Sequence, residues 1–113
     1  GKYFSPYGKA YLDIAVCTSS KILFINQTEK STRTYSGLLS FSFSNTYGNF
    51  MKMVGADIDG NGRDDLIAYT DSGYLLVYAN YLGRQSASGW QIYVVDNLGA
   101  GMVNDVDVSK FAP

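Results

Sequence analysis

A nine-residue stretch, 57–65, carries oxygen-bearing side chains at alternate positions around two glycines, and it is the part of the sequence best suited to bind a metal ion. Its relative positions 1, 3, 5 and 9 hold Asp57, Asp59, Asn61 and Asp65. In a tightly wound loop, alternate residues point their oxygens inward, and glycine allows a turn where a Cβ would clash. At position 7, Arg63 contributes only its main-chain carbonyl oxygen. The pattern predicts a Ca²⁺ site made by these five residues.

The flanks of this stretch distinguish it from a helical calcium motif. An EF-hand has a helix on each side and a bidentate glutamate at position 12, but position 12 here is Ala68. Residues 50–56 and 66–70 are short apolar segments with aromatic and β-branched members, which is typical of strands. We therefore expect the ion to staple a connection between two strands.

Catalytic chemistry has little support in the sequence. The chain has no histidine, and Cys17 lies in an apolar run, where a buried and inert thiol is expected. Glu29 is the single glutamate and stands among polar residues, as a solvated charge would. The clustered Asp residues would repel one another without a cation, whereas a glycosidase needs one carboxyl kept protonated at a set distance from another. We expect no enzymatic activity, and the absence of histidine together with hard oxygen ligands argues against zinc.

Length and charge restrict the range of partners. The chain has 113 residues, 46% of them hydrophobic and 17% charged, which suits one small globular domain. Its net charge is −1 and its basic residues form no run, so we expect no nucleic-acid binding. No apolar stretch approaches the roughly 18 residues that a membrane helix needs. The first residues contain no signal-peptide core, so a targeting segment of an exported protein would have been removed or would lie outside this sequence.

Strand signals recur along the whole chain with turn residues between them, and no long window has a helical period. An all-β fold is expected. Short turns are expected at 19–20 and 71–73, and longer polar connections at 28–36 and 81–89. The expected strands are 12–17, 21–26, 38–44, 50–56, 65–70, 74–80, 90–96 and 102–107.

The strands repeat with a period of roughly 50 residues. Residues 13–16 match 65–68 at an offset of 52, and residues 104–107 match 56–59 at an offset of 48. The chain thus divides into two four-stranded repeats and the first strand of a third. These parts cover about 1–49, 50–99 and 100–113.

The metal-binding pattern is complete only in the second repeat. In the first repeat the equivalent positions hold Ser5, Tyr7, Lys9 and Asp13, so that only the last ligand is retained. A lysine and a lone carboxylate could hardly hold a hard divalent cation, and we expect no metal there. The third copy begins with Asp105 and Asp107, but its ninth position would lie beyond Pro113.

Residues 56–67, which read Ala-Asp-Ile-Asp-Gly-Asn-Gly-Arg-Asp-Asp-Leu-Ile, resemble the FG-GAP or VCBS repeat of integrin-like β-propellers. The resemblance implies that each repeat is a four-stranded antiparallel blade and that a structural calcium ion sits between its innermost and second strands. The first repeat departs from the family's pattern at three of the four side-chain positions. The ligands carried over to this sequence are Asp57, Asp59, Asn61, the carbonyl of Arg63, and Asp65.

Two blades leave two apolar faces uncovered, because a blade buries its faces against its neighbours. We therefore expect the two blades to belong to a larger ring. Either homo-oligomerisation completes this ring, with strand 102–107 supplied to the first blade of a neighbouring copy, or a longer propeller supplies the remaining blades. A stable monomer with no companion chain would contradict both alternatives.

The resemblance also implies a class of function. Such propellers serve as lectins, adhesion modules or non-catalytic domains attached to secreted hydrolases, so a secreted or cell-surface location is expected. Aromatic residues in loops or at strand ends could stack on a sugar, and Tyr35, Tyr47, Tyr81 and Trp90 are the candidates. The aromatics that alternate within strands are expected in the core: Phe24, Phe41, Phe43, Tyr69, Tyr78 and Tyr93.

The sequence as a whole predicts a non-catalytic, calcium-stabilised extracellular recognition module, with a carbohydrate as the favoured ligand. Tyrosine-rich polar loops would serve a protein ligand equally well. The alternatives are therefore a protein–protein adhesion or assembly module, or an accessory propeller domain of a secreted hydrolase.

Overall fold

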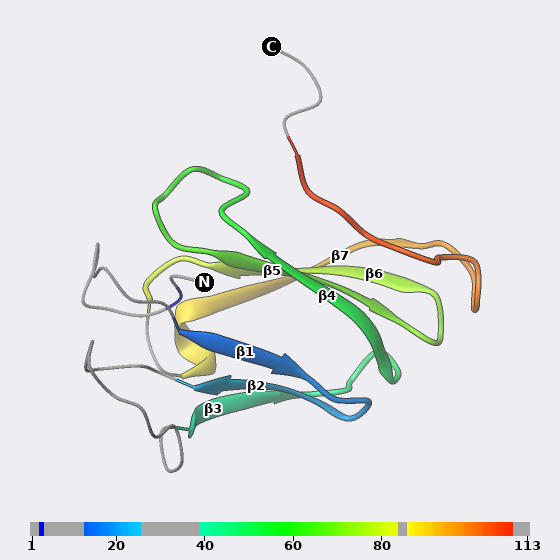
Figure 1. Cartoon of the computed structure of the whole chain (residues 1–113), viewed down its shortest axis with the longest axis horizontal. Coiled ribbons are helices and arrows are strands. Elements are labelled where there is room, and N and C mark those ends of the chain that lie inside the picture. Colours follow the sequence, from blue (N-terminus) through cyan, green and yellow to red (C-terminus); the bar gives the residue numbers. More distant parts are fainter. Residues whose placement is uncertain (1–2, 4–12, 26–38, 84–85, 110–113) are drawn as a thin grey trace.

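The structure is a computed structural model that describes residues 3, 13–25, 39–83 and 86–109, and within these ranges the fold is all-β with no α-helix. Seven strands form two antiparallel sheets (Figure 1). The first sheet contains β1 (Ile14–Cys17), β2 (Lys21–Ile25) and β3 (Leu39–Ser44). The second contains β4 (Phe50–Ala56), β5 (Asp65–Thr70), β6 (Tyr74–Asn80) and β7 (Trp90–Asn97).

Both sheets are meanders in which every strand pairs antiparallel with the next one along the chain. A single 3-10 turn, η1 (Ala87–Gly89), precedes β7. The class and the seven strands agree with the sequence prediction to within one or two residues at each end. Neither sheet closes on itself in the described part of the chain, and no helix there is long and apolar enough to cross a membrane.

The hydrophobic core lies between the two sheets, which stack face to face. Phe24 and Phe43 of the first sheet are buried against Tyr78 and Trp90 of the second. The ring centroids of Phe43 and Tyr78 are 4.9 Å apart, and those of Phe24 and Trp90 are 5.1 Å apart. These tilted contacts pack large rings against one another across the sheet interface. Such aromatic pairs contribute stability beyond that expected from the area they bury.

Tyr3 is a further member of this core, although it lies far from the strands in sequence. Its ring makes an edge contact with Phe24 at a centroid distance of 5.4 Å. Its hydroxyl lies against Gly55 so closely that a Cβ at that position would collide with it. The glycine in β4 is therefore required by a close approach rather than by a turn.

The outer strand of the second sheet, β7, is largely bare. Trp90 is buried at its start, but the residues that follow it are exposed to solvent. The large apolar ones are Ile92, Tyr93, Val94 and Val95. No strand in the described part of the chain pairs with the other edge of β7, so this strand is an open edge.

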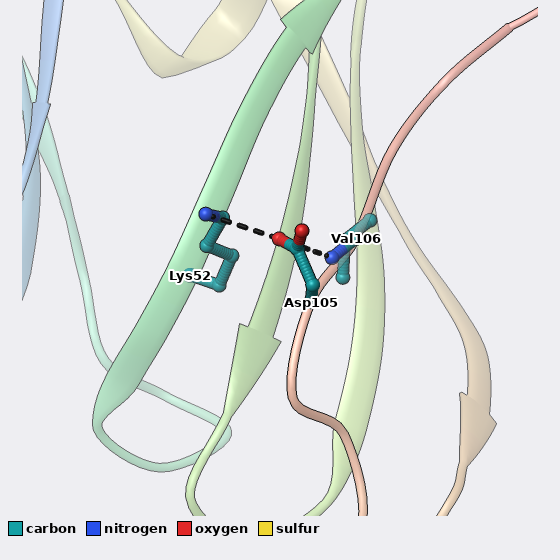
Figure 2. Close-up of polar contacts among 3 residues, drawn as sticks. All are labelled: Lys52, Asp105 and Val106. Carbon is teal, nitrogen blue, oxygen red and sulfur yellow. Dashed lines mark hydrogen bonds and ion pairs between the residues drawn. The ribbon is translucent and has the colours of Figure 1, made fainter.

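Residues 98–109 form no strand, although residues 102–107 were expected to form one. In Figure 1 this segment runs over the second sheet on the side away from the first sheet. The hydroxyl of Tyr69 donates to the carbonyl oxygen of Gly99 at 2.8 Å, and Lys52 Nζ lies 3.1 Å from a carboxylate oxygen of Asp105 (Figure 2). A strand requires a hydrogen-bonded neighbouring strand, and no strand in the described residues pairs with this segment.

Candidate metal centre

Three carboxylates converge in the loop that joins β4 to β5. One oxygen from each of Asp57, Asp59 and Asp65 can be chosen so that all three lie within 4.8 Å of one another. A single cation with oxygen ligands at 2.3 to 2.6 Å spans gaps of this size. The three are members of the set that the sequence predicted, and together they supply three negative charges at one point. The group thus has the donor chemistry of a site for a hard divalent ion.

The carboxylate of Asp57 organises the turn of the loop. Its Oδ1 accepts the N–H groups of Gly60 at 2.9 Å and Asn61 at 3.2 Å, and its Oδ2 accepts that of Gly62 at 2.8 Å. The chain can wrap around this side chain because Gly60 and Gly62 have φ angles of +75° and +87°. A residue with a Cβ at these φ values would be strained. The two glycines therefore give the loop the curvature that brings the carboxylates together.

Asn61 and Arg63, the other two predicted ligands, belong to the same hydrogen-bonded turn. Oδ1 of Asn61 accepts the backbone N–H of Arg63 at 2.9 Å. Nδ2 of Asn61 donates to the backbone oxygen of Asn80 at 2.9 Å. The amide is therefore fixed with its nitrogen toward β6. Arg63 is half-buried, and its proposed contribution is the main-chain oxygen alone.

Asp65 is almost completely buried, with 1% of its surface exposed. Its Oδ1 accepts the N–H of Asn80 at 2.7 Å and its Oδ2 accepts the N–H of Ile58 at 2.9 Å. Burial raises the pKa of this carboxyl, the two backbone hydrogen bonds lower it, and the charges of Asp59 and Asp57 raise it again. The net shift is upward. A bound cation would offset both the repulsion and the burial of the charge.

The first repeat retains one part of this arrangement. Asp13, the equivalent of Asp65, is also buried with 2% exposure, and its Oδ2 accepts the N–H of Tyr3 at 3.1 Å. In both repeats, then, the last carboxylate accepts a backbone N–H: that of Ile58 within the second loop, and that of Tyr3, two residues before the first loop begins. The remaining positions of the first loop, Ser5, Tyr7 and Lys9, lie outside the described residues.

Asn80 is the residue of this region that the sequence did not single out, and it is fully buried. Its Nδ2 donates to the carbonyl oxygens of Tyr3 at 2.6 Å and Asp64 at 3.2 Å, and its Oδ1 accepts the N–H of Gly83 at 3.0 Å. Its backbone bonds to Asp65 and Asn61 complete the link. Asn80 thus ties the loop 57–65 to Tyr3 in the first repeat and to Gly83 in the connection after β6.

The four aromatic candidates for ligand binding do not form one site. Trp90 is buried in the core and offers no face for stacking, and Tyr35 lies outside the described residues. Tyr47 is half-buried against Tyr74, with ring centroids 5.5 Å apart. Its carbonyl oxygen accepts from Thr70 at the end of β5, whereas Tyr81 follows the opposite end of the β5–β6 hairpin.

Tyr81 keeps the exposed position predicted for it, and it has an unexpected neighbour. Its hydroxyl lies 2.6 Å from that of Tyr93, and both rings are more than two-fifths exposed. Tyr93 was expected in the core and is instead on the surface, because it belongs to the open strand β7. Of the other expected core aromatics, Phe24, Phe43, Tyr69 and Tyr78 are buried. The side chain of Phe41 lies outside the described part of the structure.

Cys17 is half-buried and lies against the core between the sheets. Burial raises the pKa of its thiol, so little thiolate forms near neutral pH.

Comparison with protein family models, with curated proteins and with solved structures gives no match to this chain.

Proposed function

We propose that the loop 57–65 binds Ca²⁺ and that the chain is a non-catalytic, calcium-stabilised recognition module. The observation that carries the proposal is the convergence of three carboxylates in a glycine-curved loop. The ligands are the carboxylates of Asp57, Asp59 and Asp65, the amide oxygen of Asn61 and the carbonyl oxygen of Arg63. Calcium fits better than Mg²⁺ because a flexible ring of oxygens suits its larger and less regular coordination shell.

The ion acts as a staple. The loop joins two adjacent strands of the second sheet, and Asp65 also accepts the N–H of Asn80 on the third strand. Calcium thus neutralises the clustered carboxylates and holds β4, β5 and β6 together at one end of the sheet. Sites of this kind bind with a Kd on the order of 0.1 to 1 mM, which matches extracellular calcium. We therefore propose a secreted or cell-surface location.

In the proposed architecture the two sheets are neighbouring blades of a β-propeller. Their common meander order, their face-to-face stacking and the position of the loop between the first two strands of the second sheet support it. Within the described residues, the first sheet has one strand fewer than the second. Further blades or further copies complete the ring.

Recognition would occur beside the staple, at the tyrosine pair. Tyr81 directly follows Asn80, whose side chain and backbone are tied to the metal loop, and its hydroxyl is shared with Tyr93. Two exposed phenol rings held together in this way suit stacking against the apolar face of a sugar. A carbohydrate is the favoured ligand. An extracellular protein is the second candidate, because tyrosine is also enriched at protein interfaces.

Substitution of one ligand tests the metal site. Asp59→Asn keeps the size and one acceptor oxygen of the side chain but removes a charge, and Asp96→Asn makes the same change on exposed β7. For Kd values of about 0.1 to 1 mM, 10 mM calcium stabilises the chain by about 1.4 to 2.7 kcal/mol. Chemical denaturation with and without a chelator should show this gain in the wild type and in Asp96→Asn, and a much smaller one in Asp59→Asn. If calcium stabilised both variants equally, or did not stabilise the wild type, the proposed metal site would be wrong.

The recognition surface is tested separately with a glycan array. Tyr81→Ala should abolish a signal that Tyr47→Ala leaves intact, because Tyr81 belongs to the exposed tyrosine pair, whereas Tyr47 is half-buried against the core. A wild-type protein that binds no glycan but captures an extracellular protein through Tyr81 would favour the second candidate.

A further inference from the structure

The three strands of the first sheet and the last three of the second follow the same antiparallel order, and residues 13–16 match 65–68 in sequence, so the faces of the two sheets can be compared residue by residue. Ala15 pairs with Phe24 in the first sheet, and the equivalent Ile67 pairs with Val77 in the second. Paired residues share one face of a sheet. We call the face with Ala15 and Phe24, or Ile67 and Val77, the front face. The opposite side, the back face, carries Ile14 in the first sheet and its equivalent Leu66 in the second.

The core joins unlike faces. Phe24 on the front face of the first sheet packs in the core with Leu66 and Tyr78 on the back face of the second. This contact is heterologous, since front meets back. A heterologous contact between two copies of one unit can be repeated, because each copy still has its other face.

The unused face of the first sheet is apolar and exposed. Ile14 and Val16 on its back face are 39% and 37% exposed, whereas the equivalent residues of the second sheet, Leu66 and Ala68, are completely buried by the first sheet. Ile14 and Val16 are thus aliphatic, as are Leu66 and Ala68 at the equivalent positions of the second sheet. Among the described residues, therefore, no sheet covers the back face of the first sheet as the first sheet covers that of the second.

The front face of the second sheet already carries part of such a neighbour. Residues 98–109 lie over it, held by the bond from Tyr69 to Gly99 and the ion pair of Lys52 with Asp105 (Figure 2). Val103 is half-buried there, while Met102 is 72% exposed, the highest value among the large exposed apolar residues of the described chain. The valine side of this segment is thus half-buried, and its open side presents one large apolar side chain, that of Met102, among polar residues.

Equivalent positions also define a register. In the second sheet Val54 pairs with Ile67 and Ala56 pairs with Asp65. The offset of 48 relates Val54 and Ala56 to Met102 and Asn104, and the offset of 52 relates Ile67 and Asp65 to Ala15 and Asp13. The equivalent pairing therefore places Met102 opposite Ala15 and Asn104 opposite Asp13. β1 pairs with β2 on one edge, and no strand in the described ranges pairs with its other edge. In this register Met102 would lie on the front face of the first sheet, where Ala15 packs into the core.

We propose that a second copy of this chain docks head to tail on the first. The back face of its first sheet, at Ile14 and Val16, covers the β4–β5 half of the front face of the first copy's second sheet, which leaves the Tyr81–Tyr93 pair on the β6–β7 side open. Its β1 pairs with residues 101–104 of the first copy as a fourth strand. Met102 then enters the core of the second copy beside Ala15. The proposal rests on the blade arrangement proposed above, but it does not use the calcium loop.

Cross-linking tests the register. In a Cys17→Ser background, Ala15→Cys combined with Met102→Cys places two thiols on paired residues, which suits the 4.4 to 6.8 Å Cα separation of a disulfide. The matched control, Val16→Cys with Met102→Cys, shifts one thiol by one residue and to the opposite face. Mild oxidation should give covalent dimers and larger species with the first pair and monomers with the control. A bond within one chain, or equal ladders from both pairs, would overturn the register.

Mass measurements on the unmodified chain test the assembly itself. Sedimentation and native mass spectrometry should show species heavier than one chain that increase with concentration. Val16→Asp, which places a charge in the proposed contact, should weaken association by about tenfold or more, whereas Met51→Asp at an exposed site outside it should not. Asp59→Asn should leave the masses unchanged, so failure of the metal site and failure of assembly are read separately. A wild-type chain that stays monomeric at every concentration would refute docking of a second copy.

Discussion

Replacement of Asn80 by alanine should be among the most destabilising substitutions of a polar residue in this chain. The side chain is fully buried and serves three backbone groups: the carbonyl oxygens of Tyr3 and Asp64 and the N–H of Gly83. Alanine satisfies none of them. Each buried polar group left without a partner costs about 1 to 3 kcal/mol. We take the lower value for all three, because the small cavity left by the amide can admit water, and expect a loss of about 3 kcal/mol.

Urea denaturation followed by tryptophan fluorescence measures this loss, since Trp90 lies in the core. Asn97→Ala is the control: this exposed asparagine accepts one bond, from the N–H of Gly99 at 3.1 Å, and its loss should cost no more than about 0.5 kcal/mol. The backbone bonds of Asn80 to Asp65 and Asn61 survive either substitution. If Asn80→Ala is no more destabilising than Asn97→Ala, Asn80 does not tie the two repeats together as described.

Two further predictions concern the core. Gly55→Ala should cost about 1 to 3 kcal/mol, because the new methyl meets the hydroxyl of Tyr3, and a double-mutant cycle with Tyr3→Phe should recover part of that cost; strict additivity would contradict the contact. Burial, with smaller contributions from Tyr47 and Cys17, raises the pKa of Tyr78 to about 12. Unfolded tyrosine ionises near pH 10, so the stability gained by keeping this phenol neutral is complete below about pH 10 and is lost as the pH rises toward 12, at about 2 to 3 kcal/mol in all. Denaturant titrations across this range should show the decline, and a flat profile would argue against burial of the hydroxyl.

Much of the fold was predictable because turn residues mark the ends of the strands in the second repeat. Strands 50–56, 65–70 and 74–80 were expected with the bounds that the structure has, since glycine and aspartate mark the turns between them. The prediction of a strand at 102–107 was wrong. The segment's apolar pattern is intact, but a strand requires a hydrogen-bonding partner, and a propensity within one segment does not supply one.

The candidate metal centre was predictable for the residues that share one short loop. The spacing of Asp57, Asp59 and Asp65 sufficed to bring their oxygens together. Asn80 was missed because its partners include Tyr3, which is 77 positions away in sequence. Such a role has no local signal, apart from a polar residue at the end of an otherwise apolar strand.

The aromatic candidates were harder to place, because ring type does not reveal which element covers a residue. Trp90 begins β7 and turns into the core, whereas Tyr93 in the same strand points to solvent. Alternation along a strand predicts that neighbours differ, but it does not say which of the two faces is covered. A tyrosine within a strand was expected to be buried in the core, but Tyr93 is exposed because little covers the outer strand.

The open edge of β7 makes the chain prone to aggregate through this strand. Residues 90–95 contain no charge and no proline, and four consecutive large apolar side chains there are exposed. Segments of this composition on an unpaired edge are templates for irregular sheet growth between molecules. A higher protein concentration favours this aggregation as well as the proposed docking of copies. The yield of soluble protein therefore depends on a kinetic competition, in which folding must outpace the pairing of exposed β7 edges.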